Sequence, residues 1–152
     1  MDASRKKGFA IHIVTRKDGN KELYVKCNVI TTVGLQRMAS HMADDAPGKE
    51  LFTHMAYGTG VTSAESVENG SLETEIHRKS FDNIFAAGVI LFGDVTLLAS
   101  EIGGDSYVIS EVGLYDASAG GNLIARQLMD SSAYMTITGA ERIDTLWGII
   151  NQ

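Results

Sequence analysis

The segment ISEVGLYDASAGGNLIAR, residues 109–126, contains two short apolar stretches separated by small and polar residues. Asp, Ser and Gly between two apolar stretches are typical of a turn, so the segment predicts two strands joined as a hairpin. In the first strand, Glu111 and Gly113 flank Val112. A charge and a glycine beside a core position indicate either the edge of an active site or a structural signature.

The remainder of the chain repeats this pattern of short strands. Residues 8–30 alternate apolar and polar side chains on both sides of Asp18-Gly19, which predicts an N-terminal β-hairpin. Sixteen glycines against one proline are typical of an all-β protein with many tight turns. Further strand patterns occur at 51–60, 72–81, 86–99, 106–116, 122–130, 133–138 and 142–150.

One segment has the period of a helix. In residues 31–43, Leu35, Met38 and Met42 fall on one helical face, and Thr31 or Thr32 is placed to cap the start. The fold class predicted is mainly β: a β-sandwich-like domain with one amphipathic helix and an N-terminal β-hairpin.

The length of 152 residues suits a single domain, residues 1–152. We expect a flexible basic arm at 1–7, the hairpin at 8–30, the helix at 31–43 and a β-sandwich body at 51–150.

Charge is distributed unevenly along the chain. Residues 1–26 carry seven basic and three acidic residues, a net charge of +4, whereas the rest of the chain carries −10. A basic arm on an acidic body predicts docking on an acidic neighbour, including another copy of the chain; the alternative is a solvated hairpin face and a frayed terminus. The basic residues expected at a protein interface are Arg5, Lys6, Lys7, Arg16, Lys17 and Lys21.

The overall charge and hydropathy exclude two classes of partner. The net charge of −6 argues against a nucleic-acid binder, because phosphate neutralisation needs clustered cations. The longest apolar run, FAAGVILF at 85–92, is too short to cross a bilayer, so no membrane partner is expected.

No pattern of catalytic or metal-ligating residues stands out. The single cysteine, Cys27, lacks nearby histidines, and only His54 and His77 have the chance to meet across paired strands, whereas zinc needs three or four ligands. GGDSY at 103–107 has no histidine base after His77 in the chain, and the glycine-rich 56–71 lacks a phosphate-binding lysine. We therefore expect no enzyme activity, no cofactor, no metal and no small-molecule substrate.

Four segments taken together resemble the tail-collar and tail-fibre proteins of bacteriophages. LFTHMAYGTGVTSAESVENGSLETEIHRKS (51–80) and VISEVGLYDASAGGNLIAR (108–126) are similar to two blocks of that family. NVITTVGLQRMASHM (28–42) is similar to the family's opening helix, and IDTLWGIIN (143–151) to its closing strand.

The resemblance implies roles for the residues of the opening segment. Ile109, Val112 and Leu114 would belong to a packed strand of a β-sandwich. Gly113 would leave room for a neighbouring backbone or bulky side chain. Glu111 would be a paired or edge charge and not a catalyst.

The resemblance also implies pairings at the ends of the two blocks. Arg126 and Arg78 would form salt bridges with Glu111 or Glu75. Leu123 and Ala125 would face one side of their strand, and Ile124 and Arg126 the other. The complete set of signature residues implied is Gly58, Gly60, Glu75, Arg78, Glu111, Gly113, Asp116 and Arg126.

The function implied is that of a non-enzymatic structural protein of a tailed bacteriophage virion, made in the host bacterial cytoplasm. A tail-associated role (collar, baseplate or fibre anchoring) is favoured, with other virion proteins as partners and a homo-oligomer, preferably a trimer, as the assembly. One alternative is a capsid decoration (cement) protein, since the chain stops at Gln152 with no fibre shaft or tip. A module that binds a host receptor or sugar is the other.

Overall fold

The computed structural model describes residues 8–42, 50–62, 66, 68–103 and 106–150. The expected arm at 1–7 lies outside these residues. Within them, no helix has the length and apolar character needed to cross a membrane.

Strands dominate the described residues. They are β1 (Gly8–Thr15), β2 (Lys21–Ile30), β3 (His54–Gly58), β4 (Glu75–Ser80), β5 (Asn83–Ala87), β6 (Ile90–Leu98), β7 (Tyr107–Ile109), β8 (Glu111–Tyr115), β9 (Leu123–Leu128), β10 (Met135–Ile137) and β11 (Arg142–Ile150). The α-helix α1 spans Thr32–Met42, and two 3₁₀ turns, η1 and η2, span Ala99–Ile102 and Ser131–Ala133.

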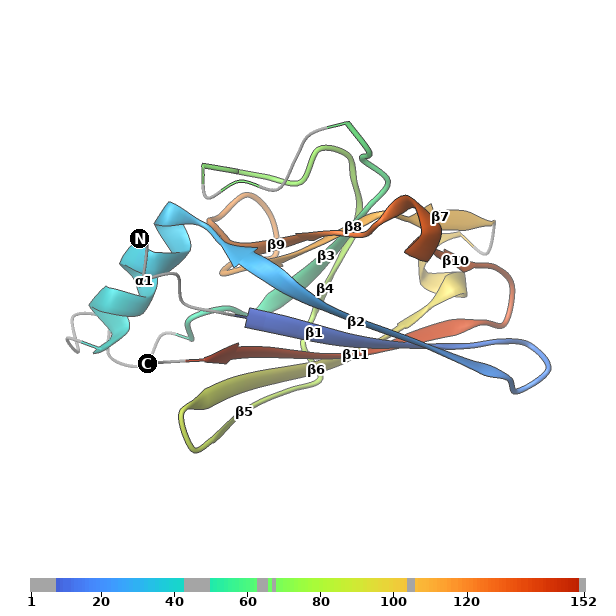
Figure 1. Ribbon diagram of the computed structural model, residues 1–152, viewed down its shortest axis with the longest axis horizontal. Helices are drawn as coiled ribbons and strands as arrows, with labels where there is room; N and C mark the ends of the chain where they lie inside the picture. The colour runs from blue at the N-terminus through green and yellow to red at the C-terminus, as the bar shows by residue number, and fades with distance from the viewer. Residues whose placement is uncertain (1–7, 43–49, 63–65, 67, 104–105, 151–152) are drawn as a thin grey trace.

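Nine of these strands form one curled sheet, a half-barrel, in the order β4-β3-β8-β9-β2-β1-β11-β6-β5, and β7 pairs separately with β10. Figure 1 shows β3, β8 and β9 lying across from β1, β11 and β6. Strand β2 joins the two halves: it pairs with β1 along Lys21–Asn28 and with β9 only through Val29 and Ile30. The mainly-β class, the single helix and the hairpin are confirmed. A sandwich has two separate sheets as its layers. In this structure the two layers are the two halves of one curled sheet.

The hydrophobic core lies between the two halves. Tyr57 from β3 and Ile124 from β9 share one buried cluster with Leu97 from β6 and Trp147 from β11, and each is fully buried. Trp147 is therefore a core residue. Burial of this apolar surface is the main force that closes the curl, because the two halves share few backbone hydrogen bonds.

Local signals explain the hairpin and the helix. Gly19, with φ +86°, supplies the left-handed residue that the β1–β2 turn requires. The Oγ1 of Thr31 accepts a hydrogen bond from the N–H of Gly34 at 2.9 Å, so Thr31 is the N-cap of α1. Leu35 and Met38 pack on the core, as their helical spacing predicts.

Two expected strands are interrupted. The stretch 86–99 contains the turn between β5 and β6, where Gly88 has φ +60°, and the stretch 106–116 is divided at Ser110 between β7 and β8. The register of β8 and β9 also shifts: Leu114 lies opposite Ala125 and Tyr115 opposite Leu123. The extra residue in β9 places Leu123 on the same face as Arg126, so the expected sides of β9 are wrong.

Candidate functional site

Glu111 of β8 and Arg126 of β9 form a buried ion pair. Both side chains are fully buried. The Nη2 and Nε of Arg126 donate to Oε2 of Glu111 at 2.8 and 3.1 Å. The antiparallel register sets Arg126 opposite Gly113, two residues from Glu111, so both charges lie on the outer face of this half of the sheet.

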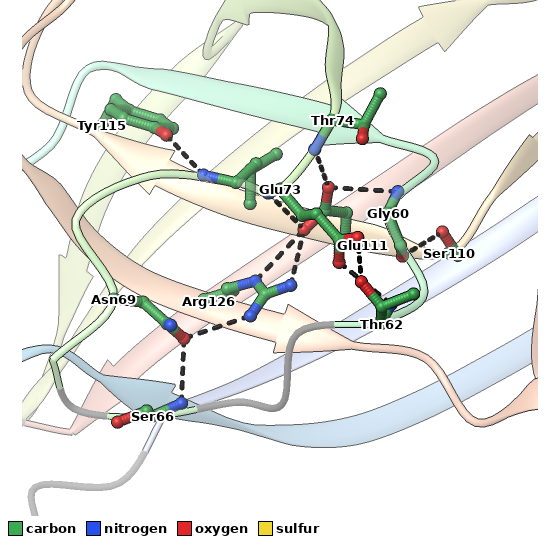
Figure 2. Close-up of polar contacts among 11 residues, drawn as sticks. Gly60, Thr62, Ser66, Asn69, Glu73, Thr74, Ser110, Glu111, Tyr115 and Arg126 are labelled. Carbon is green, nitrogen blue, oxygen red and sulfur yellow. Dashed lines mark hydrogen bonds and ion pairs between the residues drawn. The ribbon is translucent and has the colours of Figure 1, made fainter.

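The same carboxylate anchors the loop between β3 and β4, residues 59–74. Its Oε1 accepts from the backbone N–H of Gly60 at 3.2 Å and of Thr74 at 2.7 Å. Its Oε2 accepts from the N–H of Glu73 at 3.1 Å. Figure 2 shows these donors converging on Glu111 from the loop while Arg126 approaches from the neighbouring strand.

Glycines make this close approach possible. A Cβ on Gly58 or on Gly60 would lie 2.6 Å from Oε1 of Glu111. A Cβ on Gly113 would lie 2.8 Å from Leu123 and 3.0 Å from Leu72. Any side chain at these positions would push the loop away from β8, which explains glycine at these signature positions.

Further contacts hold the loop to the sheet. The Nη1 of Arg126 donates to Oδ1 of Asn69 at 3.1 Å, which also accepts from the N–H of Ser66 at 2.8 Å. The hydroxyl of Ser110 donates to the carbonyl of Gly60 at 2.7 Å. Within the loop, the N–H of Thr62 donates to the carboxylate of Glu73 at 3.0 Å.

Apolar packing completes the cover. Leu72, only 4% exposed, packs with Ala56, Tyr115 and Leu123 on the outer face of this half. The N–H of Leu72 donates to the hydroxyl of Tyr115 at 3.0 Å. The loop thus buries the outer face of β3, β8 and β9.

A second ion pair fixes the β8–β9 turn. Arg78 of β4 pairs with Glu75 at 2.7 Å, and its guanidinium lies 3.5 Å above the ring of Tyr115. Its Nη1 donates to the carbonyl oxygens of Ala117 at 3.0 Å and Gly120 at 2.7 Å. One arginine therefore connects the edge strand, an aromatic ring and the turn.

Asp116 closes that turn. Its carboxylate accepts from the backbone N–H and the Nδ2 of Asn122 at 2.7 and 2.8 Å. Arg37 of α1 lies 3.4 Å from the same carboxylate. The resemblance implied that Arg126 and Arg78 pair with Glu111 or Glu75, and in the structure Arg126 binds Glu111 and Arg78 binds Glu75. The eight signature residues lie in or beside the half formed by β3, β4, β8 and β9.

The backbone donors of the loop and the side chain of Asn69 were not identified from the sequence. Backbone N–H groups leave no trace in residue type, and an asparagine in a polar loop is typical of any turn. Tyr115 lies inside the segment 109–126, but the residues of that segment do not indicate that its hydroxyl contacts loop 59–74. The charged groups of Glu111 and Arg126 are bound by other groups of the protein. The arrangement can therefore hold loop 59–74 against strands β8 and β9.

The basic interface candidates fall into three groups. Arg5, Lys6 and Lys7 lie outside the described residues. Arg16 is engaged internally: it donates to both carboxylate oxygens of Glu22 at 2.9 and 2.6 Å, and to Glu141 at 3.0 Å. The hydrogen bond to Glu22 raises the pKa of Arg16 and holds the pKa of Glu22 at about 2. Lys17 and Lys21 are exposed.

The four histidines lie on four separate elements, β1, α1, β3 and β4. His77 lies opposite Tyr57 and His54 opposite Ser80, so the two do not face each other across β3 and β4. In the described part of the chain, no three His, Cys, Asp or Glu side chains come together as metal ligands.

His12 is fully buried in a polar network between the two halves. The amide of Gln127 donates from Nε2 to the carbonyl of Lys26 at 2.8 Å, which leaves its Oε1 to accept from Nε2 of His12 at 2.8 Å. The hydroxyl of Thr145 then donates to Nδ1 of His12, also at 2.8 Å. Burial lowers the pKa of His12 from 6.5 to about 4, because desolvation disfavours the charged ring, and the hydrogen bond to Gln127 only partly opposes this shift.

This pKa makes stability dependent on pH. Between pH 6.5 and 4 the unfolded chain binds a proton at His12 that the folded chain does not, so stability is complete above pH 6.5 and falls with acidification. We expect the His12 contribution to cost about 2 kcal/mol at pH 5 relative to pH 7.5. Urea denaturation of the wild type and of His12→Gln at both pH values measures it. An equal pH dependence in the two proteins would contradict the assignment.

Comparisons of the chain with models of protein families, with curated protein sequences and with solved structures find no match. Support for a function therefore comes from the site and from the resemblance of its segments.

Proposed function

We propose that this protein is a non-enzymatic structural component of a tailed bacteriophage virion, associated with the tail as a collar, baseplate or fibre-anchoring part. It holds other virion proteins together. One observation carries the proposal: the two blocks that resemble tail-collar proteins bind each other. Glu111 of the second block accepts from backbone N–H groups of Gly60, Glu73 and Thr74 in the first, and Arg78 of the first block donates to the carbonyl oxygens of Ala117 and Gly120 in the second.

The burial of the central pair supports a structural role over a catalytic one. Glu111 and Arg126 are fully buried, and each oxygen of the Glu111 carboxylate already accepts at least two hydrogen bonds. A general acid or base needs contact with a substrate proton, which this carboxylate lacks. The pair instead fixes a long loop on the sheet.

The proposal includes the assembly and the sandwich character of the fold. We infer a homo-oligomer, for which the resemblance favours a trimer. The two halves of the curled sheet correspond, in this proposal, to the two layers of the tail-collar sandwich. Lys17 and Lys21 on the hairpin are the described cations that contact an acidic neighbour.

The test is the position of the protein on intact phage particles, measured by electron microscopy with a gold-labelled antibody. Label confined to the tail or to one vertex is the expected result. Label spread over the icosahedral head would replace the tail assignment with capsid decoration. Particles without label, checked by mass spectrometry of the purified virions, would overturn the virion role.

Assays on simple esters and on bacterial cell-wall glycans test the non-enzymatic part. We expect no turnover above that of a denatured sample. Turnover that is lost with folding would contradict this part of the proposal while leaving the virion location as a separate result.

A further inference from the structure

Among the described residues, the outer face of the other half of the sheet carries many apolar side chains that are open to solvent. In the layer β5-β6-β11-β1-β2, side chains that point away from the core alternate with core residues such as Ala10 and Trp147. The apolar side chains on this outer face, here called the apolar face, are Phe9, Ile11, Ile13, Leu23, Val25, Cys27, Phe85, Ala87, Ile90, Phe92, Leu98, Leu146 and Ile150.

Several of these side chains are unusually open to solvent. Leu23 is 67% exposed, Val25 61% and Phe85 44%. An aromatic row crosses the face: the rings of Phe85 and Phe92 stack at 5.3 Å, and Phe92 meets Phe9 edge-on at 6.1 Å. A contiguous apolar surface of this kind marks a site of protein interaction.

Charges lie toward one end of the apolar face and are locally satisfied. The carboxylate of Asp144 accepts from Thr96 at 2.7 Å and from Arg142 at 3.0 Å. Asp94 accepts from Asn83 at 2.9 Å. These two carboxylates lie on β6 and β11, where Asp94 is opposite Leu146 and Asp144 is opposite Ile13. The part of the face on β1 and β2 around Ile11 and Val25, and the aromatic row, carry no charge.

The two halves of the sheet differ in whether another segment covers their outer face. The outer face of β3, β8 and β9 is covered by loop 59–74 through Leu72 and the Glu111 anchor. The segments outside the described residues contain only Met1 and Val67 as large aliphatic or aromatic side chains. They lack the apolar groups to cover a face of this size.

We propose that the apolar face packs against the same face of a second copy of this chain, related by a two-fold axis. Five strands about 4.8 Å apart and about eight residues long present roughly 24 by 27 Å. Two such faces together bury about 1,300 Å², which lies within the range of specific interfaces. Sheets pack face to face in this way at a separation of about 10 Å.

The chemistry of the face selects a second copy over a different partner. Interfaces within homodimers are richer in apolar surface than transient contacts between different proteins. The uncharged part of the face, which runs from Val25 and Phe9 to Phe92 and Phe85, offers no charge pattern that a different partner could recognise. It can oppose the same part of a second copy without like-charge repulsion, although the chain carries −6 overall. This contact is additional to a trimer, since a dihedral assembly contains both three-fold and two-fold contacts.

The test uses Val25→Lys in the full chain, with Val108→Lys as the matched control. Val25 is exposed on the apolar face, whereas Val108, 45% exposed, lies on β7. Neither substitution removes a core side chain, and circular dichroism checks the fold of both variants. Sedimentation equilibrium at several protein concentrations measures the association.

We expect a dimer, or an even-numbered multiple, for the wild type and for Val108→Lys. Val25→Lys raises the dissociation constant about 100-fold or more, because the two-fold axis buries the new charge twice. Raising the salt from about 0.1 M to about 0.5 M, which shortens the screening length to a few Å, leaves the wild-type dimer intact. An assembly held together by the charges of the basic arm would instead dissociate at the higher salt concentration.

Cys27 supplies a second measurement that needs no substitution. It is an exposed thiol on the apolar face. We expect its reaction with a thiol reagent to slow as the wild-type concentration rises, and to be independent of concentration in Val25→Lys. A wild-type monomer at about 100 µM, a purely three-fold oligomer, or assembly unchanged in Val25→Lys would each overturn the proposal. None of these results bears on where the protein sits on virions, so the two proposals fail separately.

Discussion

Replacing Arg126 with methionine is expected to lower the free energy of unfolding by about 3–5 kcal/mol, because the variant leaves the Glu111 carboxylate buried without its counter-charge. The loss is measured by urea denaturation at neutral pH. Hydrogen exchange at the N–H groups of Gly60 and Thr74 should rise as well, since both donate to that carboxylate. The local readout separates release of the loop from a general loss of stability.

An exposed ion pair supplies the matched control. The side chains of Arg142 and Asp144 are 48% and 35% exposed, so Arg142→Met should cost less than about 1 kcal/mol. In many proteins an apolar replacement of both partners restores stability. Here the double variant Glu111→Leu, Arg126→Met should remain destabilised, because the N–H groups of the loop lose their acceptor. Full recovery would show that the ion pair does not anchor the loop.

The second large effect is expected for Gly34→Ala at the start of α1. A Cβ at this position would lie 2.1 Å from the carbonyl oxygen of Ile124, which is backbone and has little freedom to move. The substitution should push α1 off β9 and cost about 3 kcal/mol, despite the gain of about 1 kcal/mol in helix propensity from glycine to alanine. Thermal and urea denaturation measure the balance.

Gly70→Ala is the control for Gly34→Ala. A Cβ at Gly70 meets no atom within 4 Å, so stability should change by less than about 0.5 kcal/mol. A Gly34→Ala variant as stable as wild type would mean that α1 docks on β9 less closely than the structure shows.

Local chemistry allowed much of the fold to be predicted. Asp18-Gly19 and Gly120-Gly121 mark hairpin turns, and Thr31 marks the start of the helix. The β5–β6 turn was not predicted, because Gly88 lies inside a continuous apolar run. That run is apolar on both sides of the sheet, so the alternation that would reveal two strands is missing. The joining of both halves through β2 depends on pairings between distant segments, which no local pattern encodes.

The same limit applies to the site. The resemblance allowed ion pairs of Arg126 and Arg78 with Glu111 or Glu75 to be predicted, but not which glutamate each arginine binds. The burial of Glu111 and Arg126 was not predictable, because it depends on loop 59–74 folding over β8 and β9. Arg16 was expected at an interface, yet it donates to Glu22 of its own hairpin, to Glu141 in the turn before β11 and to the backbone carbonyl of Thr136.

Strand β2 also determines how the molecule bears mechanical load. Its backbone connection to β9 consists of the pairs Val29–Arg126 and Ile30–Ala125, whereas its ladder with β1 runs from Lys21 to Asn28. A force that pulls the two halves apart therefore meets two residue pairs before it reaches side-chain packing, while a force along either half is resisted by long ladders. We expect a partner bound to one half to leave the sheet intact under tension. A partner that pulls the two halves in opposite directions is expected to separate β2 from β9.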